Sequence, residues 1–173
     1  DKAESDPVTG AFKFTTPLLE ENSYTLTFYN DSSFLSCRTI IVDSLASVNY
    51  KMNGLKIQLP KLITGKKYLM EEVQFVKHTT DLLSPANNSL ASFSRLMKMN
   101  NKMIVRIEAH ANDPFGNIGE ENCMKLSEVR GKKINELLIA KGINKLRISM
   151  TPHGREEMQF PNAINEREYQ ANR

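Results

Sequence analysis

The sequence predicts an α+β protein, in which a short antiparallel β segment precedes a β-α-β-α-β arrangement. Apolar and polar residues alternate up to about residue 49, and strand-like and helix-like patterns then take turns from residue 68. No apolar run approaches the roughly 18 to 20 residues that a membrane helix needs, so we expect no direct membrane insertion. The length of 173 residues, with 40% hydrophobic residues, allows a packed core but excludes a large multidomain enzyme.

Charge and cysteine content exclude several classes of function. The chain has 23 Lys and Arg against 20 Asp and Glu, and a net charge of +3 is too small for a nucleic-acid-binding surface. Cys37 and Cys123 are far apart, which argues against a zinc ribbon and against a disulfide framework. The chain begins with Asp-Lys-Ala-Glu and shows no signal peptide, so we expect its start to be the edge of an excised fragment.

The first 49 residues have the period-two pattern of a β-meander. Turn-forming segments separate three expected strands, at residues 10–14, 24–29 and 35–42. Three strands are too few for independent stability. We therefore expect a partial β-sandwich or β-meander segment over residues 1–49, followed by a linker over residues 50–67 that contains the Asn53-Gly54 turn and Pro60.

From residue 68 onward the pattern predicts three strands and two helices. The strands are expected at residues 68–75, 103–109 and 146–150, and the helices at residues 85–100 and 122–140. Ser84 fits a hydroxyl cap before Pro85 in the first turn, and Gly142 fits the left-handed position after a helix. The apolar stripes of the two helices are expected to be Leu90, Phe93, Leu96 and Met97, and Leu126, Val129, Ile134, Leu137 and Leu138.

Two resemblances refine this picture. The phrase Thr9-Gly-Ala-Phe-Lys-Phe, followed by a loop and Tyr24-Thr-Leu, resembles the end of a carboxypeptidase-regulatory-like β-sandwich, and an unrelated β-meander remains the alternative. Residues 68–173 resemble the OmpA-like C-terminal domain, a peptidoglycan-binding module. The matching segments are Ile107-Glu-Ala-His110, Leu126-Ser-Glu-Val-Arg130, Lys141-Gly-Ile143, Arg147-Ile148, His153-Gly154, Pro161-Asn162 and Asn172-Arg173.

The OmpA-like resemblance implies both a fold and a place in the cell. It implies a mixed sheet with helices on one face, a periplasmic location associated with the outer membrane, and the peptidoglycan stem peptide as ligand. The segment Leu59–Tyr68 is similar to the lead-in of Bacteroidetes-type members. Together with the regulatory-like segment, it resembles the layout of the peptidoglycan-anchoring subunit of the type IX secretion system, which implies other outer-membrane or secretion proteins as partners.

The chain departs from the family pattern at the expected ligand loop. The family's Gly-His-Thr-Asp is replaced by Ala109-His110-Ala111-Asn112-Asp113, in a loop about two residues longer than usual. Cys123 stands where the family usually has Asn, Tyr169 where it usually has Arg, and the family continues beyond the closing Asn-Arg with a last strand. These departures weaken the expectation of ligand binding more than the expectation of the fold.

The resemblance implies a site for diaminopimelate, whose free end carries an ammonium and a carboxylate. Arg130 can offer a planar fork of donors to the carboxylate, although an isolated helix arginine is usually just solvated. Asp113 can hold the ammonium better than the neutral Asn112, although Asp113 before Pro114 also fits an ordinary turn. Glu120 and Glu121 are the rival anions. The other predicted site residues are Leu126, Cys123, Asn172 and Arg173.

Catalysis and metal binding are not expected. His78, His110 and His153 lie on separate elements, so we expect no metal and no cofactor. A nucleophilic pair of Cys123 and His110 lacks an oxyanion element and an orienting acid. The leading interpretation is a non-catalytic module that anchors an envelope assembly to the cell wall. The alternatives are a degenerate domain that serves as a protein-protein scaffold, and an enzyme acting on wall peptides.

Overall fold

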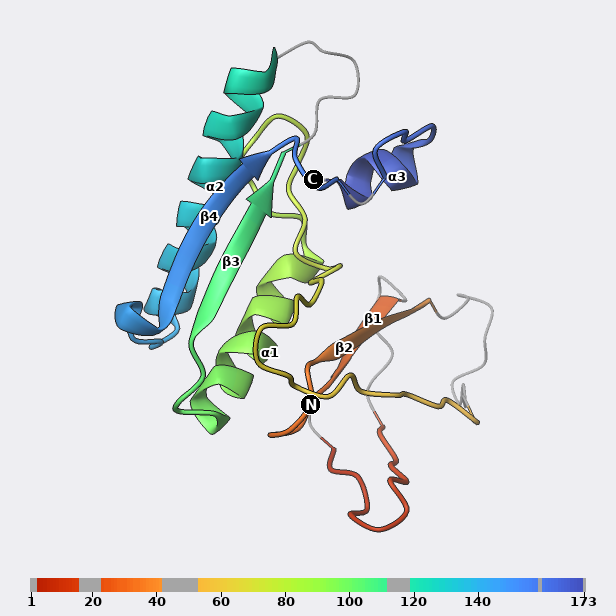
Figure 1. The fold of residues 1–173 in the computed structure, drawn as a ribbon. Coiled ribbons are helices and arrows are strands. Elements are labelled where there is room, and N and C mark those ends of the chain that lie inside the picture. The colour runs from red at the N-terminus through yellow and green to blue at the C-terminus, as the bar shows by residue number, and fades with distance from the viewer. Residues whose placement is uncertain (1–2, 16–22, 42–52, 112–118, 159, 173) are drawn as a thin grey trace. The chain divides into compact units, whose positions relative to one another are not determined.

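The computed structural model describes residues 3–15, 23–41, 53–111, 119–158 and 160–172 (Figure 1). The chain divides into two compact units. One unit comprises Asp1–Leu26 and Arg38–Lys56, and the other comprises Thr27–Cys37 and Ile57–Arg173. The predicted α+β class is confirmed, because the described residues combine helices with small sheets. The predicted boundaries after residues 49 and 67 stay a prediction.

Strands β1 (Ser23–Phe28) and β2 (Ser36–Ile41) form a two-stranded sheet, as the alternation predicted. The predicted strand at residues 10–14 is wrong, because the structure, which describes all five residues, assigns none of them to a strand. The chain before them forms a tight turn instead, in which Gly10 N donates to Asp6 O and Asp6 N donates to Ala11 O, both at 2.8 Å. Local turn bonds thus take up backbone groups that a strand would need.

The segment between β1 and β2 contributes to the core of the second unit. Phe34 and Leu35 are both 7% exposed. The Phe34 ring stacks on Tyr68 at 4.6 Å between centroids, and Phe34 N donates to Pro60 O at 2.7 Å. Leu62 N donates back to Ser32 O at 2.9 Å. The predicted linker over residues 50–67 is therefore packed structure in part, because apolar contacts and backbone bonds fix residues 60–62.

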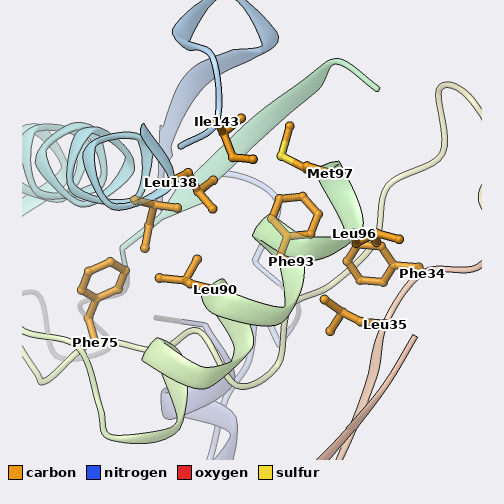
Figure 2. Packing of buried hydrophobic residues seen from close by; sticks show 10 residues of the cluster. Phe34, Leu35, Phe75, Leu90, Phe93, Leu96, Met97, Leu138 and Ile143 are labelled. Carbon is orange, nitrogen blue, oxygen red and sulfur yellow. The ribbon is translucent and has the colours of Figure 1, made fainter. Parts of the chain in front are cut away.

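Helix α1 (Pro85–Met99) begins at the predicted proline. The expected Ser84 cap is wrong, because Ser84 has helical backbone angles and its hydroxyl makes no capping bond. The predicted apolar stripe is confirmed, since all four of its residues are buried. Figure 2 shows these side chains converging with those of the next helix in one cluster, which consists of Phe34, Leu35, Phe75, Leu90, Phe93, Leu96, Met97, Ile134, Leu138 and Ile143.

Strands β3 (Val105–His110) and β4 (Ile148–Gly154) form a parallel pair, with Val105 opposite Ile148. Helix α2 (Gly119–Ala140) connects them and runs along the sheet in Figure 1, which confirms the second β-α-β unit of the predicted arrangement. Gly142 ends this helix at φ +86°, in the predicted left-handed conformation. A 3-10 helix, Lys145–Arg147, leads into β4, and a short helix α3, Glu166–Ala171, lies near the end of the chain.

The strand predicted at residues 68–75 is wrong. Within the described residues, its one ladder contact is an isolated bridge between Phe75 and Leu82. An open cavity of about 2120 Å³ is lined both by residues 61–75 and by residues of β3. A strand needs a hydrogen-bonded neighbour at about 4.8 Å, and in the described part of the chain residues 68–73 are assigned to no strand or bridge.

The inner face of α2 differs from the predicted stripe. Val129 is 50% exposed, and Leu126 is half-buried. The buried positions are spaced by three, four or one residues and so follow one helix face: Cys123, Ser127, Arg130, Gly131, Ile134 and Leu138. Small residues are needed there because the sheet approaches closely. A Cβ added at Gly131 would lie 2.4 Å from Met150 Cγ.

Candidate functional site

The carboxyl ends of β3 and β4 meet the second turn of α2. Ala111 N donates to Gly154 O at 2.8 Å, and Gly154 N donates to the Ser127 hydroxyl at 3.0 Å. The same hydroxyl donates to Met124 O at 2.8 Å. Gly154 has φ +51°, and a Cβ there would lie 3.2 Å from the backbone of Met124. Ser127 and Gly154 therefore fix the helix against the end of the sheet.

Arg130 lies one turn further along the inner face of α2 and is 1% exposed. Its Nε donates to Thr79 O at 3.0 Å, and one terminal nitrogen donates to Val76 O at 3.1 Å. The guanidinium carbon also lies 4.8 Å from the centre of the Phe75 ring, in a cation-π contact. Arg130 thus joins α2 to the segment that precedes α1.

The partner of Arg130 is a tight turn, Val76–Thr79. Thr79 N donates to Val76 O at 3.1 Å, Asp81 N donates to the Thr79 hydroxyl at 3.0 Å, and Val76 N donates to Asp81 O at 2.8 Å. His78 adopts φ +58°, a left-handed conformation that is unusual for a residue other than glycine. Local bonds therefore hold this turn in a backbone conformation that residues other than glycine adopt infrequently.

Two imidazole rings stack at the end of the sheet. The rings of His110 and His153 are 5.0 Å apart at 13°. The ring nitrogen Nδ1 of His110 lies 2.9 Å from Glu156 O, and His153 Nδ1 lies 4.0 Å from the Glu156 carboxylate. These contacts give His110 a packing role at the end of the sheet. In the described part of the chain, no three His, Cys, Asp or Glu side chains are grouped to hold a metal ion.

A charged cluster lies beside the histidine pair. Lys67 Nζ is 2.8 Å from Glu108 and 2.6 Å from Glu157, and Arg106 is 3.0 Å from Glu108. The hydrogen bond from Lys67 lowers the pKa of Glu108, against the opposing effect of burial. The same lysine lowers the pKa of Glu157, and the hydrogen bonds that Lys67 donates to these two carboxylates raise the pKa of Lys67. At neutral pH these groups are therefore held in their charged forms.

The predicted site residues are only partly brought together. Arg130 and Cys123 lie on the buried face of α2, where Cys123 is 0% exposed. The side-chain amide of Asn172 accepts from Phe160 N at 2.9 Å and donates to Phe160 O at 2.7 Å. These two bonds connect the end of the described chain to the segment before α3. The predictions for Asn112, Asp113 and Arg173 lie outside the described residues.

Sequence reasoning missed the groups that position Arg130 and the strand ends. Ser127 lies in the Leu126–Arg130 segment that resembles the family, but its polarity did not indicate that its hydroxyl would accept a hydrogen bond from Gly154 N. The spacing was the available signal: Ser127 is four residues after Cys123 and three before Arg130, so the three side chains lie on one face of a helix. The sequence did not indicate the Val76–Thr79 turn, because the segment contains neither glycine nor proline, and His78 takes the left-handed backbone conformation that glycine usually supplies.

Comparison with known proteins identifies the fold. A model of the OmpA family matches residues 74–173. The peptidoglycan-associated lipoprotein from Burkholderia pseudomallei is similar with a TM-score of 0.53 and 15% identity, over 58% of this chain and 82% of that one. The OmpA-like domain of FopA1 from Francisella tularensis subsp. tularensis SCHU S4 gives 0.52 and 14%, over 98% and 90%.

The periplasmic domain of MotB from Helicobacter pylori is also similar, with a TM-score of 0.51 and 14% identity, over 59% of this chain and 64% of that one. At these identities the three structures establish the fold alone. No curated protein sequence matches the chain. No helix within the described ranges has both the length and the apolar character needed to span a membrane.

Proposed function

Because the chain belongs to the OmpA family, we propose that residues 68–173 form a non-catalytic module that binds peptidoglycan and so anchors an envelope assembly to the cell wall. The observation that carries this proposal is the segment Leu126–Arg130. It places Ser127 and Arg130 one helical turn apart on the buried face of α2, beside the carboxyl ends of the parallel strands. A fold similar to that of a peptidoglycan-associated lipoprotein supports it.

The proposed ligand group is the diaminopimelate of the stem peptide. Its carboxylate would bind Arg130, whose planar guanidinium suits a two-point contact. Its ammonium would bind Asp113, because a neutral amide such as that of Asn112 cannot compensate a charge removed from water. Leu126 and Cys123 would border this site from α2, and Asn172 and Arg173 from the C-terminal segment.

The proposed context is the periplasmic side of the outer membrane. The resemblance of residues 59–68 and of the N-terminal segment supports a role as the anchoring subunit of a type IX secretion system, with other secretion proteins as partners. In this proposal β1 and β2 belong to a regulatory-like β-sandwich that precedes the wall-binding module.

A second candidate function is a protein-protein scaffold that has lost wall binding. The contacts of Arg130 and Asn172 favour it, because both side chains bond to backbone groups of their own chain. Arg147 shows that this fold uses arginine for such a purpose. It donates to the carbonyl groups of Met97, Asn100 and Met103 at 2.7–2.8 Å.

Retention on purified, insoluble peptidoglycan tests the two candidates. We expect the chain to sediment with diaminopimelate-containing walls at low salt. Walls that carry lysine in place of diaminopimelate are the matched control, because lysine lacks the extra carboxylate, and we expect them to retain less protein. Equal retention would contradict recognition of diaminopimelate, and no retention on either wall would favour the scaffold.

The assignment of the ammonium contact needs its own comparison. We expect Asp113→Asn to weaken binding of a diaminopimelate-containing muropeptide, measured by calorimetry, by roughly tenfold or more, because charge-assisted bonds contribute about 1.5–3 kcal/mol. Glu120→Gln and Glu121→Gln, near the start of α2, are the controls and should bind normally. Loss confined to a glutamate variant would move the ammonium contact to the helix.

A further inference from the structure

The contacts of Arg130 leave almost none of its side chain open to solvent, although the residue lies at the wall of the open cavity. The side chain is 1% exposed, and the carbonyl groups of Val76 and Thr79 lie on two of its nitrogens at 3.1 and 3.0 Å. A ligand the size of a stem peptide therefore cannot contact this guanidinium unless part of the protein moves.

The Val76–Thr79 turn is an exposed part of the surroundings of Arg130. Val76, Lys77 and His78 are exposed, whereas the helix face that carries Arg130 is packed against the sheet. The turn is held mainly by bonds within residues 76–81. Its centre, His78 at φ +58°, adopts a conformation that is disfavoured by sterics, so the closed turn is less stable than an ordinary one.

We propose that the Val76–Thr79 turn is a movable cover, which occupies Arg130 in the absence of ligand and is displaced by an anionic group of the ligand. The inference rests on the proposed function, because it names how that site is opened. A carboxylate makes stronger, charge-assisted bonds to guanidinium than a neutral carbonyl group does, so the exchange is favourable. Val76 is exposed and Thr79 is half-buried, so water can bind their carbonyl groups once these are released.

Substitutions at His78 change the stability of the closed turn without touching Arg130. His78→Val should open the turn, because a β-branched residue is a genuine outlier at positive φ. His78→Gly should close it more firmly, since glycine adopts this conformation without steric strain. Lys77→Val is the matched control, because Lys77 is exposed and has no positive φ.

Chemical modification of arginine by phenylglyoxal, followed by mass spectrometry on the full chain, reports on the cover without any ligand. Arg147 serves as an internal reference, because its three carbonyl partners belong to α1, Asn100 and Met103 rather than to the turn. Relative to Arg147, we expect the modification rate of Arg130 to rise about fivefold in His78→Val. We expect it to fall about twofold or more in His78→Gly, and not to change in Lys77→Val.

The association rate of a diaminopimelate-containing muropeptide, measured by stopped flow, should change in the same direction as the modification rate. An Arg130 modification rate that is the same in all variants would overturn the inference that the turn is a movable cover. If His78→Val does not fold, His78→Gly still decides, because an unchanged or faster rate there contradicts the inference. Modification that responds as expected, in a protein that binds neither muropeptide nor wall, would retain the cover and overturn the proposed function instead.

Discussion

Replacement of Arg130 by alanine should destabilise the protein as well as weaken any ligand contact. The substitution removes two hydrogen bonds from a charged donor, to Val76 O and Thr79 O, and a cation-π contact with Phe75. A hydrogen bond to a charged group contributes about 1.5–3 kcal/mol, but water can rebind the carbonyl groups of an exposed turn. We therefore expect Arg130→Ala to lower the free energy of unfolding by about 2–4 kcal/mol.

Urea denaturation followed by circular dichroism at the helix band measures this change, because α1, α2 and α3 all belong to the second unit. Lys132→Ala is the matched control. Lys132 is on the same helix but exposed, and its pair with Glu128 at i, i+4 contributes only about 0.3–0.5 kcal/mol. An Arg130→Ala protein as stable as this control would refute the structural role of Arg130.

Three further predictions concern the rest of the chain. Gly154→Ala should destabilise the protein by about 2–3 kcal/mol in the same urea assay, because the added Cβ would crowd α2. Gly65→Ala is the control and should cost only about 1 kcal/mol, because Gly65 also has a positive φ but has open space around it. Because the pKa of Glu108 is lowered in the folded state, its contribution to stability is present above its ordinary pKa of 4.5 and is lost as pH falls below it. Glu108→Gln should therefore lose less stability than the unchanged protein on acidification. Equal slopes of unfolding free energy against pH in the two proteins would contradict the ion pair. An isolated fragment of residues 1–49 should show no cooperative melt by circular dichroism, because Phe34 and Leu35 would lose their partners in the core.

The sequence predicted best the elements whose patterns are local. The stripe of α1 and the glycine that ends α2 depend on spacing and on backbone geometry within one element, and both are confirmed. The strand at residues 68–75 failed for the opposite reason. Its alternation is real, but a strand exists only beside a partner, and spacing along the chain does not show whether a partner is in reach.

The inner face of α2 could not be predicted from hydrophobicity. An apolar stripe at helical spacing normally marks the core, and this assumption selected Val129, which is exposed. The true inner face begins with Cys123, Ser127 and Arg130, because the helix there bonds to backbone groups of other segments rather than packing apolar surface. Polar residues on a buried face are the deviations from pattern that functional or specially constrained sites produce.

One motif therefore serves two purposes, and this has a consequence for any test of binding. Ser127 fixes α2 to the end of β4, and Arg130 fixes the same helix to the Val76–Thr79 turn, so the Leu-Ser-x-x-Arg segment is needed for the fold whether or not a ligand binds. Lost binding in an Arg130 variant cannot by itself distinguish a ligand contact from a displaced helix. Substitutions at His78 can, because they change access to Arg130 and leave its donors in place. The structural role and the ligand role of Arg130 exclude each other only if the turn never opens.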